Sequence, residues 1–228
     1  MAHIKKFSLA LNKLGSEIGN FMPWHTSTDL YHWLIAELLL RRTTRTAACK
    51  AYIELINFYP NWFSLALATI DEIKKNISWV GLGNQRSRQL KAIAVLISNN
   101  GNDSEIISSR EKLESLPGVG RYIADVILLN LGGKKEFPVD ANVQRVLRRN
   151  MGLDAPISTR HVDPYKDNQI IKIIENLKQN NSCNSLVSCH KAVLSIGWNS
   201  CRSQPKCNNC PINQICVSYG GPIKVDTF

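Results

Sequence analysis

Four cysteines near the end of the chain are close enough in sequence to surround one metal centre. They lie in CRSQPKCNNCPINQIC, at Cys201, Cys207, Cys210 and Cys216. Thiolates bind soft metals, and the spacing is compatible with either a [4Fe–4S] cluster or a structural zinc. Such crowding, in a chain with an odd total of seven cysteines, favours a metal site in a reducing compartment over a disulfide scaffold. The pattern assigns no role to the remaining three, Cys49, Cys183 and Cys189.

A second candidate for chemistry is the carboxylate of Asp140, in the segment EFPVDANVQRVLRR, where a helix is expected to begin. The ordinary role of an aspartate at this position is that of helix N-cap. This role is compatible with catalysis because helix-terminal amides favour the ionised carboxylate. A negative charge held there could stabilise an oxocarbenium-like sugar while an N-glycosidic bond breaks.

One acidic residue, Glu37, interrupts the apolar stretch WLIAELLL. If it is buried, its carboxyl group favours the protonated form and could act as a proton donor or general base. If it lies on a solvent-facing side of the helix, it needs no such role. The sequence leaves both alternatives open, and Glu37 therefore ranks second to Asp140.

The segment LESLPGVGRYIADVILLNL predicts two helices joined by a tight turn. Gly118 and Gly120 permit backbone geometry that other residues resist, and free amides at the start of the second helix, beside Arg121, can bind a phosphate. A hairpin of this kind holds DNA without reading its sequence, although an ordinary helical hairpin uses the same glycines. The net charge of +10, from 28 basic and 18 acidic residues, also suits a polyanionic partner.

The elements that must position these groups are predicted to be helices, because strand-like alternation is nearly absent. The expected fold class is all-α. One long helix is expected from Thr28 and Asp29 to the Tyr59–Pro60 step. Ser108 with Glu111 predicts a capping box. Further helices are expected at 70–77, 86–98, 109–116, 121–131 and 170–177, and at 186–196, where Gly197 would end the helix.

The sequence gives no sign of a membrane protein. No apolar run approaches the ~20 residues that a membrane-spanning helix needs. The N-terminal stretch also lacks the apolar region and cleavage site of a signal peptide. A cytoplasmic, nucleoid-associated protein is therefore expected.

Taken together and in this order, the motifs resemble the endonuclease III superfamily of helix-hairpin-helix DNA glycosylases. The resemblance covers nearly the whole chain, and Asp140 follows Gly120 by 20 residues, as in the family. The segments ELLLRRTT, VGLGNQRSRQL, LPGVGRYIADV and EFPVDANVQRV look most like the archaeal-type mismatch glycosylases, which remove thymine or uracil opposite guanine. One departure is that five residues separate the first two cysteines, where the usual family pattern has six.

The resemblance implies two all-α lobes with a DNA cleft between them. Residues 29–136 would form a helical barrel that contains the hairpin. Residues 1–28 and 137–228 would form an iron–sulfur domain that carries the catalytic Asp140. The implied cofactor is a [4Fe–4S] cluster on the four C-terminal cysteines. The implied assembly is a monomer on double-stranded DNA that contains a mispaired or damaged base, with no membrane partner.

Base removal from a duplex requires that the nucleotide be flipped out and that the gap be filled. The candidates to fill the gap or hold the orphaned partner are Arg41, Arg42 and Leu82, the last in a Gly-Leu-Gly turn that could wedge into the stack. Contacts with the partner guanine or nearby phosphate are expected from Asn84, Gln85 and Arg86, and DNA contacts also from Arg121.

The position of Tyr122 is diagnostic in the family, because lyase-competent relatives carry a lysine there and adenine glycosylases usually a serine. A phenol cannot form a Schiff base, so the resemblance implies a monofunctional enzyme. Two alternatives are an adenine glycosylase acting opposite 8-oxoguanine and a non-catalytic DNA-binding iron–sulfur protein. Tyr122 and a chain that ends at Phe228 argue against the first, and Asp140 argues against the second. The sequence does not fix the exact target base or its partner.

Overall fold

The computed structural model describes residues 2–100, 102–153 and 163–219, and every regular element within them is a helix. The all-α class expected from the sequence is thus confirmed. The chain divides into two compact units. Unit 1 combines Met1–Gly19 with Lys134–Phe228, and unit 2 is Asn20–Gly133. Within the described residues, no helix is both long and apolar enough to cross a membrane.

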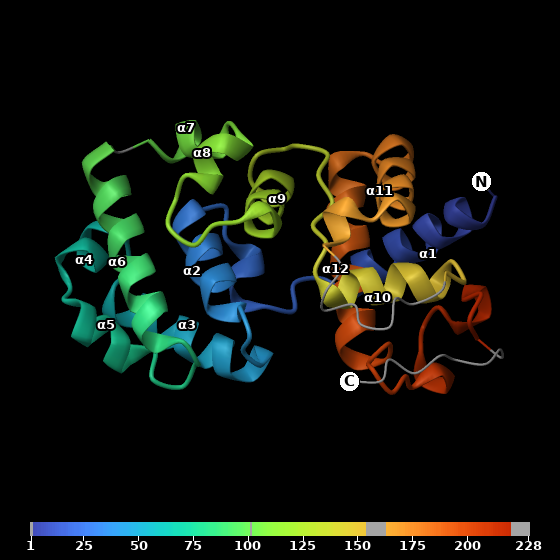
Figure 1. Cartoon of the computed structure of the whole chain (residues 1–228), viewed down its shortest axis with the longest axis horizontal. Coiled ribbons are helices and arrows are strands. Elements are labelled where there is room, and N and C mark those ends of the chain that lie inside the picture. Colours follow the sequence, from blue (N-terminus) through green and yellow to red (C-terminus); the bar gives the residue numbers. More distant parts are fainter. Residues whose placement is uncertain (1, 101, 154–162, 220–228) are drawn as a thin grey trace. The chain divides into compact units, whose positions relative to one another are not determined.

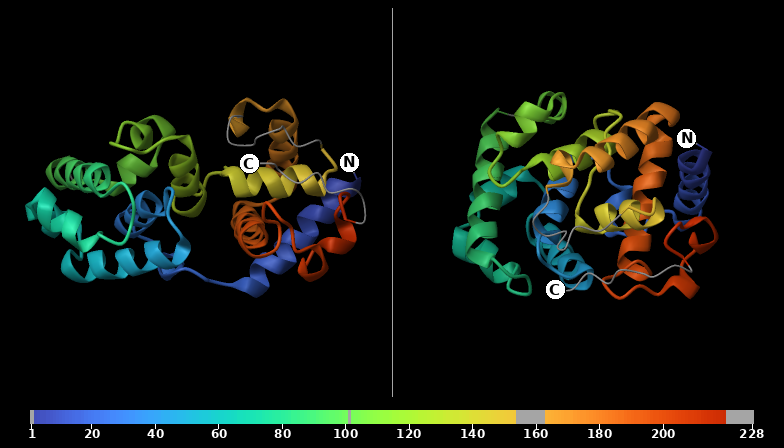
Figure 2. Two further views of the ribbon diagram at one scale, coloured as in Figure 1. Left: turned by 60° about the horizontal axis from the view of Figure 1, so that its bottom comes forward. Right: turned by 45° about the vertical axis from the view of Figure 1, so that its right-hand side comes forward.

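Unit 2 is built around one buried helix, α2 (Leu30–Leu40). Apolar residues occupy all faces of α2, and nearly all of its side chains are buried, as expected of a helix at the centre of a core. Helices α3, α6 and α9 pack against it (Figures 1 and 2). The other elements are η1 (Pro23–Thr26), α3 (Arg45–Phe58), α4 (Trp62–Leu67), α5 (Ile70–Asn76), α6 (Gly83–Asn100), α7 (Asp103–Ile107), α8 (Arg110–Glu114) and α9 (Arg121–Asn130).

The single long helix expected from Asp29 to Tyr59 is wrong, because the chain breaks between α2 and α3. Arg42 has a φ of 50°, in the left-handed region, and a right-handed helix cannot continue through it. Thr44 then begins α3 as its N-cap, with its side chain accepting a hydrogen bond from the Ala47 amide at 3.3 Å. The break leaves Arg41 and Arg42 exposed in a turn at the end of α2.

The capping box expected from Ser108 and Glu111 is also wrong. Ser109 is the N-cap of α8, and its hydroxyl accepts from the Lys112 amide at 3.3 Å. Ser108 instead ends the preceding short helix, α7, which the sequence analysis did not predict. A one-residue shift of this kind is common where two serines compete for the same cap.

Unit 1 joins the two ends of the chain. Its elements are α1 (Ala2–Ile18), α10 (Ala141–Asn150), η2 (Pro164–Lys166), α11 (Asn168–Asn180), α12 (Cys183–Asn199), η3 (Cys207–Asn209) and η4 (Asn213–Ile215). Helix α1, which the sequence analysis did not predict, packs along α12 (Figure 1). The two helices approach at a glycine, because a Cβ on Gly15 would lie only 2.0 Å from the carbonyl oxygen of Ser188. A buried pair of hydrogen bonds between Ser8 and Asn181 ties α1 to the end of α11.

The boundaries of the two units differ from the expected residues 28/29 and 136/137. Residues 20–28 belong to unit 2 because Trp24 is buried there, with its ring centroid 5.2 Å from that of Tyr52 on α3. The indole of Trp33 on α2 also donates to the Ser27 carbonyl at 2.9 Å. At the other boundary, Glu136 belongs to unit 1, where it pairs with Lys178 of α11 at 2.8 Å.

Helix α12 runs past Gly197 to Asn199, so the expected helix end at Gly197 is wrong. This glycine has a packing role instead. A Cβ on Gly197 would lie 2.9 Å from the Cβ of Asn142, and its absence lets α10 and α12 approach closely. His190 lies earlier on α12 and is buried. Its imidazole donates a hydrogen bond to the Pro138 carbonyl, and burial lowers the pKa of His190 to about 3. The neutral imidazole thereby anchors the irregular segment that leads into Asp140.

Candidate functional site

Asp140 is the N-cap of α10, as the sequence predicted, and both of its carboxylate oxygens are engaged. Oδ1 accepts from the Val143 amide at 2.8 Å, and Oδ2 accepts from the side-chain amide of Asn142, also at 2.8 Å. The residue is half-buried. Two N–H donors at the helix N-terminus fix the orientation of the carboxylate. The group is therefore a preorganised carboxylate that solvent can still reach.

A line of hydrogen bonds runs from Asp140 to the cysteine-rich segment. Asn142, which donates to Asp140, accepts from Arg145 Nη2 at 2.8 Å. The same guanidinium donates through Nε to the Cys201 carbonyl at 2.6 Å and through Nη2 to the Gly197 carbonyl at 3.1 Å. The sequence analysis did not single out Asn142 or Arg145. Their signal in the sequence was the string of polar residues that follows Asp140 on one helix.

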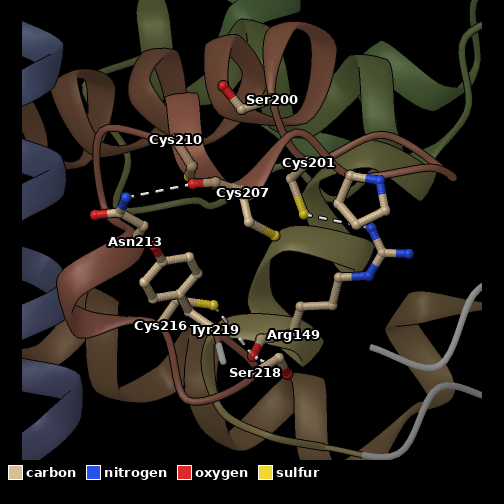
Figure 3. Close-up of a pocket in the computed structure, with 10 residues that line it drawn as sticks. Arg149, Ser200, Cys201, Cys207, Cys210, Asn213, Cys216, Ser218 and Tyr219 are labelled. Atoms are coloured by element: carbon tan, nitrogen blue, oxygen red, sulfur yellow. Dashed lines mark hydrogen bonds between the residues drawn. The ribbon is translucent and has the colours of Figure 1, made fainter. Parts of the chain in front are cut away.

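The four cysteines named from the sequence line one pocket, all of them half-buried (Figure 3). The sulfurs of Cys201, Cys207 and Cys216 point into the same space. Burial, together with the charges of the other three thiols, raises the pKa of Cys210 to about 11. Among the described residues, however, no three His, Cys, Asp or Glu side chains converge on a position for one metal ion. The thiols thus share a pocket without closing around a single ion.

Arg149, at the end of α10, holds both ends of the cysteine segment. Its guanidinium donates to Cys201 Sγ at 3.6 Å and to the Ser203 carbonyl at 3.2 Å (Figure 3). Its own carbonyl accepts from the Ser218 hydroxyl at 2.7 Å and from the Cys216 thiol at 3.6 Å. The side chain is buried. Sequence reasoning missed this residue, because the sequence of α10 contains several arginines and does not show which of them is buried.

The predicted hairpin is formed by α8, the turn at 115–120 and α9. Gly118 has a φ of 84°, and a Cβ there would lie 2.5 Å from the side-chain amide of Gln89. Gly120 is the N-cap of α9, is exposed and has open space where a Cβ would be. Among the residues that the structure describes, none caps this helix end with its side chain, and the first amides of α9 lie beside the exposed Arg121. This is the geometry that the sequence analysis expected of a phosphate-binding hairpin.

A second pocket lies beside the hairpin, within unit 2. Its lining is Arg41, Gly118, Val119, Gly120, Arg121, Tyr122 and Ile123. Arg41 Nη1 donates to the Gly118 carbonyl at 3.3 Å, so the turn after α2 and the hairpin are in direct contact. The structure thus brings together three residues that the sequence analysis named separately, namely Arg41, Gly118 and Tyr122.

The remaining candidates in unit 2 divide between core and surface. Glu37 is only 6% exposed, so the solvent-facing alternative for it is wrong. Leu82, by contrast, is 44% exposed and has a φ of 61°. Asn84 and Gln85 are exposed in the first turn of α6. Arg86 is 2% exposed, and the DNA contact expected for it is wrong because its guanidinium points into the unit. Cys49 is half-buried and Cys189 buried in the described part of the chain, whereas the side chain of Cys183 lies outside it.

Comparison with known proteins shows the family of the chain. The family model described as "HhH-GPD superfamily base excision DNA repair protein" matches residues 35–163, which is more than half of the chain. The chain belongs to this superfamily. It is 33% identical over 199 residues to a thymine-DNA glycosylase of Aeropyrum pernix, covering 87% of this chain and 86% of that protein. It is also 33% identical over 217 residues to a thymine/uracil-DNA glycosylase of Pyrobaculum aerophilum, covering 94% and 92%.

A solved structure described as a thermostable thymine-DNA glycosylase superposes with a TM-score of 0.78 at 28% identity, covering 96% of this chain and 97% of that one. The resemblance inferred from the sequence motifs is thereby confirmed.

The two glycines of the hairpin should respond differently to the same substitution. Gly118→Ser places a side chain at positive φ and displaces the amide of Gln89, so we expect a loss of about 1–2 kcal/mol in the free energy of unfolding. Gly120→Ser adds a good N-cap in open space and should leave that free energy unchanged or slightly higher. Urea unfolding of both variants measures the difference, and equal destabilisation by the two would contradict the assigned geometry.

Proposed function

We propose that this protein is a DNA glycosylase that removes thymine or uracil mispaired with guanine, in base excision repair. The observation that carries the proposal is Asp140, a carboxylate held at a helix N-terminus with both oxygens oriented by donors. The choice of base is supported by the thymine- and thymine/uracil-DNA glycosylases that the chain resembles over most of its length. These relatives do not favour an adenine glycosylase or a non-catalytic protein.

The proposed reaction breaks the bond between C1′ of the deoxyribose and N1 of the pyrimidine. The base leaves with the bonding electron pair and takes up a proton, and the sugar passes through an oxocarbenium-like state. The negative charge of Asp140 stabilises that positive state, and its two fixed hydrogen bonds mean that little reorganisation is needed. Water then adds at C1′ and loses a proton, which leaves an abasic site. The buried Glu37 is a second candidate for proton transfer.

The surface of unit 2 supports the proposed binding of duplex DNA. The first amides of α9, beside Gly118, Gly120 and Arg121, would bind a backbone phosphate. The exposed Leu82 would enter the base stack, and Arg41 and Arg42 lie in an exposed turn that could hold the orphaned partner. Asn84 and Gln85 are exposed directly after Leu82 and would contact the partner base or its phosphate.

We also propose that the cysteine pocket binds a [4Fe–4S] cluster. Cys201, Cys207, Cys210 and Cys216 supply the four thiolates that such a cluster needs. When bound, the cluster would cross-link a segment that has only short helices of its own. Arg149 would donate to one ligand sulfur, and Arg145 would connect the segment to Asp140.

The enzyme is proposed to be monofunctional and to act as a monomer. A glycosylase with lyase activity needs an amine that attacks C1′, whereas this chain has Tyr122 at the position that supplies the amine in lyase-competent relatives. Tyr122 is half-buried and lines the pocket beside the hairpin. In the proposal, its ring contacts a base or sugar near the hairpin without forming a covalent bond to it.

Replacement of Asp140 tests the function directly. Asp140→Asn keeps the N-cap and the shape of the side chain but removes the charge, so excision should fall by about 100-fold or more while duplex affinity persists. Single-turnover excision would be measured on duplexes containing G·T, G·U, 8-oxoguanine·A and oxidised pyrimidines. Asp29→Asn, at the exposed N-cap of α2, is the matched control and should remain active. Full activity of Asp140→Asn would refute the assignment.

Tyr122 tests the monofunctional proposal. Because a phenol cannot attack as an amine, base removal should leave an intact abasic strand that breaks only after alkali or heat. Borohydride should trap little covalent complex with the wild-type protein. Tyr122→Lys should form more borohydride-trapped complex if the side chain reaches the sugar. Tyr122→Ser should change the base preference and should form no more trapped complex than the wild type. Efficient trapping of the wild type on G·T or G·U would show that another amine acts.

The metal content of the purified protein tests the cluster. We expect broad absorption near ~400 nm and about four irons per chain. Cys201→Ser should lower the iron content and the unfolding temperature together, whereas Cys49→Ser, outside the cysteine pocket, should change neither. A colourless protein that contains one zinc per chain would contradict the proposal.

A further inference from the structure

Arg86 is a buried arginine whose guanidinium connects two exposed segments of unit 2. It lies in the first turn of α6 and is 2% exposed. Nε donates to the Leu38 carbonyl at 3.1 Å, Nη2 donates to the Arg41 carbonyl, and Nη1 donates to the Gly81 carbonyl. The first two acceptors are at the end of α2, and the third immediately precedes Leu82. One side chain therefore bridges the Arg41–Arg42 turn and the loop that presents Leu82.

Backbone carbonyls compensate the charge of Arg86. Within the described part of the chain, no carboxylate forms an ion pair with Arg86. The last carbonyls of α2 lack helical partners and carry the negative end of the helix dipole, so a cation is favourable there. Burial of an arginine is costly unless such donors and acceptors are matched. The position is thus selective for a group that can reach three carbonyls at once.

The loop before α6 holds Leu82 in an unfavourable conformation. A leucine in the left-handed region costs roughly 1–2 kcal/mol, and such a residue persists only where its surroundings enforce it. The loop is fixed on its other side by Trp79, whose indole donates to Glu54 Oε2 at 2.5 Å while Lys50 Nζ lies 3.5 Å from the ring centroid. Val80 is buried, and the Arg86 amide donates to the Leu82 carbonyl at 2.9 Å. Leu82 itself remains exposed.

We propose that Arg86 is a positioning residue that locks Leu82 and the Arg41–Arg42 turn into one rigid DNA-facing surface. The proposal rests on the proposed glycosylase function. A side chain that enters the base stack must offset an unstacking cost of roughly a few kcal/mol. If the loop were also ordered at that moment, each immobilised residue would add to the cost. Arg86 orders the loop in the free protein, so the wedge and the two arginines meet the duplex already in register.

Lysine cannot replace this function. Arginine presents five donors in a planar fork, whereas the lysine ammonium is a single point with three donors on a flexible stem. Arg86→Lys keeps the positive charge but cannot span carbonyls on both segments. Arg88→Lys is the matched control, because Arg88 follows Arg86 by two positions on the same helix and is exposed.

The first measurement is hydrogen–deuterium exchange of the free protein. In Arg86→Lys we expect amides at 79–84 and 41–44 to exchange roughly tenfold faster, with α9 unchanged, and we expect no change in Arg88→Lys. If Arg86→Lys does not fold, Arg86→Gln, which retains one donor group, takes its place. Unchanged exchange at 79–84 would overturn the proposal whether or not the protein excises any base.

The second measurement is a double-mutant cycle on a G·U duplex. Arg86→Lys should lower single-turnover excision about tenfold in the wild-type background and clearly less in the Leu82→Ala background, because part of the arginine's effect passes through the wedge. Equal losses in both backgrounds would show a general structural role and overturn the proposal. An inactive wild-type protein would instead refute the proposed function, while the exchange measurement would still decide the role of Arg86.

Discussion

The capped N-terminus of α10 is the constraint on which the proposed chemistry depends. A single helix carries Asp140 at its first turn and two arginines, Arg145 and Arg149, that donate to the cysteine segment from its later turns. The carboxylate and the cysteine pocket are therefore held on one rigid element. Close contact with α12 at Gly197, and the anchoring of Pro138 by His190, fix this helix within unit 1. Any shift of α10 would move both sites together.

Buried or half-buried arginines that donate to backbone carbonyls recur in both units. Arg145 and Arg149 bind carbonyls of the cysteine segment, and Arg86 binds carbonyls at the end of α2. The acceptors lie in irregular backbone or in the last turn of a helix, where carbonyls lack helical partners. The planar guanidinium satisfies several such acceptors from one position. Arginine side chains on regular helices thereby stabilise the turns and loops that present the candidate functional groups, and those groups stay accessible.

The local motifs could be predicted from the sequence because their signals are local. A Pro-Gly-x-Gly turn, an aspartate before an amphipathic helix and four close cysteines specify a hairpin, an N-cap and a shared thiol pocket, since each depends on residues only a few positions apart. Helix ends were predicted less well. The break at Arg42 was missed because helical periodicity continued across it. The cap at Ser109 was missed because two adjacent serines are equally suitable caps.

By itself the sequence determined the all-α class, the family, and the identity of Asp140, the hairpin glycines and the cysteines as candidates. Only the tertiary structure decided which polar residues are buried. Glu37 lies in the core, Arg86 points inward, and Gly197 packs against α10 instead of ending a helix. Residues 20–28 join unit 2 through Trp24 for the same reason. Each of these outcomes depends on contacts between segments distant in sequence, which the side-chain pattern of a single helix or turn does not encode.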